Sequence, residues 1–173
     1  MLVEAENYFA LIVEPTCAEY FERPWDFRRG ILSLIVTSHM VDYWVMDNYA
    51  GSQSRKAMGD AVSHGRLALT GLHPDLQLLA DAADAAKHGR LASLQNRTRQ
   101  ISGADQLQST PGIFNAPFGQ GVFAEAMEIY FDSPEGRRVS IRRLLTQTLD
   151  FWRGQLGIQS KAQPSAPGQE IPD

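Results

Sequence analysis

Five stretches of the chain combine apolar residues with strong helix formers, and proline, glycine and capping residues separate them. We expect the first helix over residues 4–22, where Pro15 either kinks it or opens a second short helix. The second, over 26–49, is apolar around a broad face, so it should lie centrally. The others are expected over residues 52–62, 74–88 and 140–157.

Local signals mark several of these helix ends. The side chains of Asp26 and Ser140 are of the types that cap the N-termini of helices, and Pro74 marks the start of a third helix. Gly89 and Gly157 follow the last periodic residues, as expected for glycines that end a helix in a left-handed conformation. These signals fix the positions of the last two helices best.

A short antiparallel hairpin is expected at about residues 122–139, before the last helix. Alternate residues up to Phe131 are mostly apolar, residues 133–136 suit a turn, and 137–139 suit a returning strand. Ala124, Ala126 and Glu128 equally suit a helix. Glycine and proline interrupt residues 91–121, which we expect to be mostly loop.

The fold class predicted is therefore mainly α, a helical bundle with one small hairpin. A chain of 173 residues that is 43% apolar can bury one substantial core, so residues 1–158 should form one domain. Residues 159–173 contain three prolines and no cluster of large apolar side chains, which indicates a flexible tail.

Composition excludes several classes of protein. No apolar run approaches the roughly 20 residues of a membrane span, and Glu4 and Glu6 stand where a signal peptide needs basic residues. The single cysteine, Cys17, forms no internal disulfide and suits a reducing compartment. We expect a cytoplasmic protein that does not enter membranes.

The net charge of −4 argues against a surface given over to phosphate binding. Arginines nevertheless gather in two places, which we interpret either as solvated basic faces or as local contacts to RNA phosphates. The first group is Arg97 and Arg99, and the second is Arg137, Arg138, Arg142 and Arg143.

One polar constellation suits chemistry. Its members are His39, Asp42, Asp81, Asp84, Lys87 and His88. His39 and Asp42 are three residues apart and Asp84 and His88 four apart, so each pair shares a helix face. If the two helices are neighbours, the pairs meet in one cleft, where a carboxylate orients an imidazole for acid/base work and Lys87 stabilises negative charge.

Two other interpretations use the same residues. Histidine and aspartate side chains on paired helices are also ligands for a divalent metal. Alternatively the residues are structural: Lys87 and His88 complement a helix C-terminus, and Asp42 satisfies a partly buried His39. No cofactor is expected on any of these interpretations except the metal itself.

Residues 38–44 (SHMVDYW) and 81–88 (DAADAAKH) resemble segments of helical proteins related to the HEPN superfamily. The resemblance implies a helical bundle. Many members of that superfamily are dimeric, metal-independent ribonucleases that use an arginine followed by four to six residues and a histidine, and others are inactive partners. Arg66 and His73 have that spacing in this chain.

Three functions follow as hypotheses. The first is a HEPN-like interaction or accessory module, acting as a homodimer or with another protein. The second is a metal-independent endoribonuclease that uses His39 and His88, or Arg66 and His73. The third is a metal-binding helical bundle.

Overall fold

The computed structural model describes residues 4–92, 99–110, 128–133 and 135–158 of the 173-residue chain. It is mainly α-helical, with a small sheet before the last helix, which confirms the predicted fold class. The principal elements are α1 (Ala5–Tyr8), η1 (Phe9–Val13), α2 (Glu14–Glu22), α3 (Phe27–Ser38), α4 (Met40–Asp47), α5 (Arg55–Leu72), α6 (Asp75–His88), η2 (Ala104–Gln106), β1 (Gln108–Ser109), β2 (Ile129–Asp132), β3 (Arg138–Ser140) and α7 (Ile141–Leu156).

The first predicted helix changes its winding just before Pro15. Residues Phe9–Val13 form the π-helical turn η1 between α1 and α2. Proline has no N–H, and its ring crowds the carbonyl four residues earlier, which a wider turn relieves. The hydroxyl of Thr16 donates to the carbonyl of Ile12 at 2.6 Å, a side-chain bond beside this altered turn.

The prediction of one helix over 26–49 was wrong. Asp26 does cap the start, since its carboxylate accepts the backbone N–H of Arg29 at 3.1 Å, but α3 ends at Ser38 and α4 begins at Met40. The Ser38 hydroxyl donates to the Ile35 carbonyl at 2.8 Å, a local bond that competes with the helix ladder. The break leaves His39 at the junction.

Helix α5 also differs from its prediction, because it runs to Leu72 rather than ending near residue 62. Three glycines lower its helix propensity. One of them, Gly65, lies against Val45 of α4 so closely that a β-carbon there would overlap the valine. This close packing between helices is a tertiary contact that the local sequence does not show.

Helix α6 begins and ends where the sequence predicted, with Gly89 at φ 72° after its last residue. It is more deeply buried than a one-sided helix, since seven of its fourteen residues are buried, Asp81 among them. It packs on α3 and α7. The core lies between these helices and α2, around fully buried Trp152, Tyr20 and Leu34.

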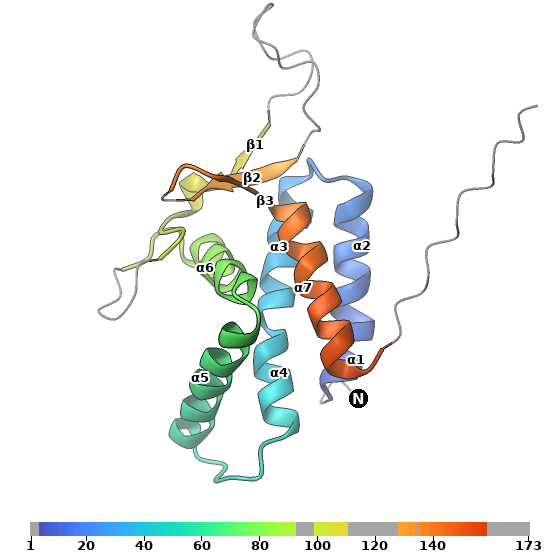
Figure 1. The fold of residues 1–173 in the computed structure, drawn as a ribbon, viewed down its shortest axis with the longest axis vertical. Helices are drawn as coiled ribbons and strands as arrows, with labels where there is room; N and C mark the ends of the chain where they lie inside the picture. Colours follow the sequence, from blue (N-terminus) through green and yellow to red (C-terminus); the bar gives the residue numbers. More distant parts are fainter. Residues whose placement is uncertain (1–3, 93–98, 111–127, 134, 159–173) are drawn as a thin grey trace, which may run out of the picture.

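The hairpin is confirmed for the described residues, with β2 and β3 antiparallel and Phe131 opposite Val139. A third strand, β1, pairs with the other edge of β2 and lies in the segment expected to be loop. The sheet lies across one end of the helices, next to the start of α7, and α4 and α5 extend at the opposite end (Figure 1). The earlier part of the predicted hairpin, residues 122–127, lies outside the described residues.

Helix α7 confirms both of its predicted ends. The Ser140 hydroxyl oxygen accepts the N–H of Arg143, and Gly157 follows the helix at φ 69°. The predicted tail, 159–173, lies outside the described residues. Of the helices that the structure describes, none combines the length and apolar character needed to span a membrane.

Candidate functional site

The predicted constellation is partly assembled where α3, α4, α5 and α6 meet. His39 stands at the junction of α3 and α4, and Lys87 lies in the last turn of α6. Their side chains are in contact, with 3.0 Å between Nε2 of His39 and Nζ of Lys87. The two helices are therefore neighbours, as the cleft hypothesis required.

The His39–Lys87 contact defines the protonation of the histidine. A lysine ammonium carries only donors, so Nε2 must accept, and the proton of a neutral imidazole then lies on Nδ1. Burial lowers the pKa of His39 below its ordinary value, and the charges of Lys87 and Arg66 lower it further, while Asp42 and Asp84 oppose them. His39 is therefore a neutral hydrogen-bond acceptor near neutral pH.

Asp42 does not orient His39 as predicted. Its carboxylate instead forms an ion pair with Arg66 of α5, at 3.1 Å between Oδ1 and Nη2. Both side chains are about one-third or more exposed, at 42% for Asp42 and 33% for Arg66. Arg66 thus belongs to this site, but through a carboxylate from α4 rather than through a histidine.

Asp81 is a structural residue rather than an exposed member of a cleft. It is completely buried and accepts hydrogen bonds from the side chains of Gln77 and Arg99 and from the backbone N–H of Gln100, at 3.1–3.3 Å. Arg99 also lies 3.9 Å from Asp84, which is 42% exposed. Sequence reasoning placed Arg99 in a loop and missed this partnership, because only the fold brings residues 99–100 onto α6.

The remaining histidines lie apart from this contact. His88 is exposed, and among the described residues no hydrogen bond or ion pair joins its side chain to another group. His73 ends α5, and its ring meets the edge of Phe151 with centroids 5.1 Å apart. Six residues lie between Arg66 and His73, so the two are seven helical steps apart, a rise of roughly 10 Å. The structure does not join these two side chains.

The metal hypothesis also has no ligand set in the part of the chain that the structure describes. No group of three or more His, Cys, Asp or Glu side chains is placed there to hold an ion. Within the constellation, Asp42, Asp81 and Asp84 each have an arginine as partner, which an added cation would have to displace.

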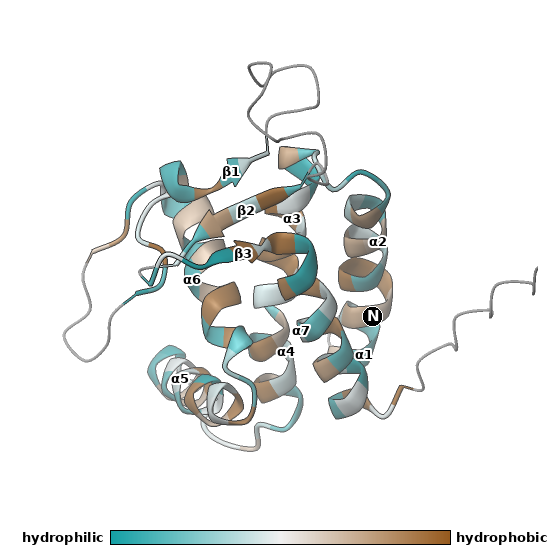
Figure 2. Ribbon diagram, turned by 45° about the horizontal axis from the view of Figure 1, so that its top comes forward, coloured by the Kyte–Doolittle hydropathy of each residue, from teal (hydrophilic) through white to brown (hydrophobic). Residues whose placement is uncertain are grey.

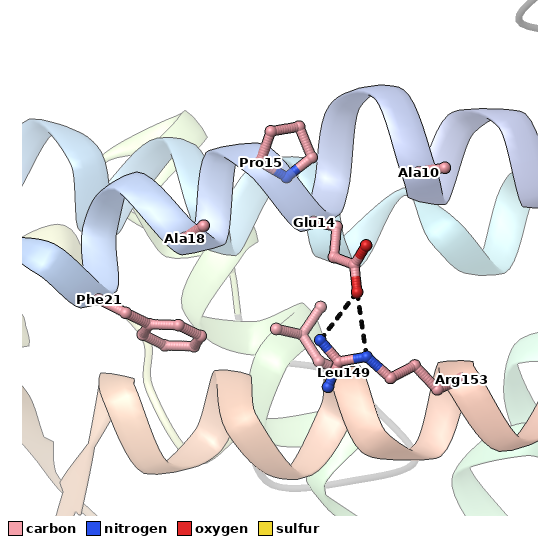
Figure 3. A pocket seen from close by; sticks show the side chains of 7 residues that line it. All are labelled: Ala10, Glu14, Pro15, Ala18, Phe21, Leu149 and Arg153. Atoms are coloured by element: carbon pink, nitrogen blue, oxygen red, sulfur yellow. Dashed lines mark hydrogen bonds and ion pairs between the residues drawn. The ribbon is translucent and has the colours of Figure 1, made fainter. Parts of the chain in front are cut away.

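A separate cavity of about 400 Å³ lies between α2 and α7 (Figure 3). It contains none of the predicted site residues. Oε1 of Glu14 accepts both Nε and Nη2 of Arg153 across it, at 3.1 and 2.9 Å, and Arg153 also bonds to Asp150. The charges in its wall are thus already satisfied, and the pair joins the two helices.

Comparison with protein-family models, with curated proteins and with solved structures finds no match for this chain. The HEPN resemblance therefore stays a prediction that rests on the residues of the two segments alone.

Proposed function

We propose that this protein is a HEPN-like interaction or accessory module that binds a second copy of itself through α4 and α5. The observation that carries the proposal is how little of α5 the fold covers. Only Leu69 is buried in this eighteen-residue helix, whereas α6 buries seven of fourteen residues. Helix α5 packs mainly on α4, with fewer contacts to α6.

Apolar side chains remain on the surface of this helix pair. Leu67 and Leu72 of α5 are 72% and 70% exposed. A cavity of about 360 Å³ opens between the two helices, and its wall includes Trp44 of α4 and Tyr49, which follows α4. Apolar positions are visible along α5 at the edge of the molecule (Figure 2). Leu67 and Leu72 do not line this cavity, but large exposed apolar side chains on one helix are typical of interaction sites.

A two-fold dimer covers the same face on both copies. Complete burial of one leucine side chain contributes about 1.5–3 kcal/mol, so four leucines that start about 70% exposed contribute roughly 4–8 kcal/mol. Association itself costs about 4–15 kcal/mol. We therefore expect a dimer that dissociates on dilution, since the leucines alone barely offset that cost.

The HEPN character of the proposal rests on the resemblance of two segments of the sequence, 38–44 and 81–88. These segments are far apart in the sequence but meet at the His39–Lys87 contact.

Sedimentation equilibrium of the full chain, from low to high micromolar concentration, tests self-association. We expect the average mass to rise toward that of a dimer, and Leu67→Asp with Leu72→Asp to hold the protein as a monomer. Leu11→Asp is the matched control, since Leu11 is 61% exposed but lies on η1. The proposal is contradicted if the unaltered protein is a monomer at every concentration. It is also contradicted if Leu11→Asp lowers the average mass as much as the two α5 substitutions do.

Metal-independent RNA cleavage is the second candidate, and the His39–Lys87 pair favours it. A neutral imidazole accepts a proton and an adjacent ammonium stabilises the charge that develops on a phosphate, and here Lys87 must first release Nε2 of His39, because that nitrogen carries the only free lone pair of the ring. The test is cleavage of a mixed RNA pool in EDTA. Activity lost in His39→Ala and Lys87→Ala but kept in His73→Ala and His88→Ala supports this function, and no cleavage by the unaltered protein refutes it.

A further inference from the structure

A third cavity, of about 260 Å³, lies where the β2–β3 turn meets the first turns of α6 and α7. Its wall includes three arginines, Arg137, Arg138 and Arg143, together with the polar side chains of Gln147 and Asp75. It is distinct from both the His39–Lys87 site and the α4–α5 surface. A strongly basic cavity is unexpected in a chain with net charge −4.

The three arginines are not equally engaged. Arg138 lies 3.9 Å above the Tyr130 ring and 3.9 Å from the Asp132 carboxylate. Arg137 is close enough to the exposed Glu135 to help lower the pKa of that carboxyl, after the hydrogen bonds from Ser133 and the Glu135 backbone, but makes no ion pair with it.

Arg143 forms no ion pair with any residue that the structure describes. By contrast, the guanidinium groups of Arg66, Arg99 and Arg153 all contact carboxylates. Among the described residues, then, two guanidinium groups without an ion-pair partner border the same small cavity: that of Arg137 before β3 and that of Arg143 in α7.

The start of α7 does not add to this positive charge. Ser140 caps the helix by accepting the N–H of Arg143, and its hydroxyl donates to the carboxylate of Glu128, which is not among the residues that line the cavity. The first turn of α7 contains no acidic residue, but the Glu128 carboxylate at the cap offsets the positive end of the helix dipole. The positive charge of the cavity therefore comes from the arginines.

We propose that this cavity binds the phosphate group of a small phosphomonoester. Guanidinium groups match phosphate oxygens through paired N–H donors, and the Gln147 amide supplies a further donor. The volume is just below the range of drug-sized small-molecule sites, which suits a phosphate on a compact body rather than a long polymer. The Asp75 carboxylate accepts hydrogen bonds and repels a second anion, so the rest of the ligand should carry hydroxyl groups and no additional negative charge.

Isothermal titration of the full chain with ribose 5-phosphate, inorganic phosphate and sulfate tests the site. We expect saturable binding of ribose 5-phosphate, weakened about tenfold or more in Arg143→Gln and Arg137→Gln. Arg142→Gln is the matched control, because Arg142 is the adjacent exposed arginine of α7 and does not line the cavity. Asp75→Asn should tighten the binding of inorganic phosphate.

Three results overturn the proposal. The first is no saturable binding of the phosphates. The second is equal weakening in the Arg142 control, which indicates a general charge effect. The third is a short single-stranded RNA that binds more tightly than ribose 5-phosphate and loses affinity in Arg143→Gln, which assigns the cavity to a nucleic-acid backbone instead.

Discussion

Replacement of Asp81 by alanine provides the most direct test of how the candidate site is built. Asp81 belongs to the constellation that the sequence suggested for chemistry, yet its carboxylate is completely buried. It accepts from Gln77, from Arg99 and from the backbone N–H of Gln100. The alanine variant leaves the Gln100 N–H and one side of the Arg99 guanidinium without this acceptor.

The cost follows from these lost bonds. Removal of one member of a buried ion pair destabilises a protein by about 3–5 kcal/mol, and the 14% exposure of the Arg99 side chain lets water recover a little of that. We expect Asp81→Ala to lower the free energy of unfolding by roughly 3 kcal/mol. This is a large share of the 5–15 kcal/mol that is typical of a domain.

Asp84→Ala is the matched control on the same helix. Asp84 contacts the same arginine, but at 3.9 Å and with a side chain 42% exposed, so its loss should cost about 1 kcal/mol or less. Urea unfolding followed by tryptophan fluorescence measures both variants. A loss below about 1 kcal/mol in Asp81→Ala, or equal losses in the two variants, would refute the assignment of Asp81 to the structure.

Two further predictions concern the helix contacts. Lys87→Met should raise the pKa of His39 in an NMR titration, because the lysine charge is the largest cause of its lowering after burial. As the pH falls, His39 takes up its proton at a higher pH in the unfolded chain than in the folded protein, where its pKa is lowered. The free energy of unfolding should therefore fall as the pH drops below about 6.5, and it should fall less steeply in the variant. Gly65→Ala should destabilise, because the new methyl group overlaps the stiff side chain of Val45, an effect of about 1–3 kcal/mol. A β-carbon at Gly59 meets nothing within 4 Å, so Gly59→Ala should stabilise α5 by about 0.5–1 kcal/mol. Thermal unfolding measures both variants, and midpoints that shift in the same direction would contradict this reasoning.

Local sequence was sufficient for the last two helices. The Asp75 and Ser140 starts and the Gly89 and Gly157 ends all lie where capping chemistry predicts them. These signals act over three or four residues, so they do not depend on the rest of the fold.

The errors arose where distant residues decide the outcome. Helix α5 was expected to end near residue 62, but it runs to Leu72, and Val45 of α4 packs against Gly65 in this added part. Strand β1 formed inside a segment read as loop because β2 offered it an edge, with Gln108 opposite Tyr130. Neither contact can be predicted from the local pattern of apolar and polar residues.

The candidate site divides in the same way. The sequence by itself determined that Asp42, Asp84 and Lys87 lie on helices, since a helix fixes the spacing of its own side chains. His39 was expected inside a helix as well, but it lies at the junction of α3 and α4. Only the tertiary structure decided the partners of these side chains: Lys87 for His39, Arg66 for Asp42, and Arg99 for Asp81 and Asp84. Hydrogen bonds and ion pairs act over a few ångströms, and the packing of the core selects which helices and loops come that close.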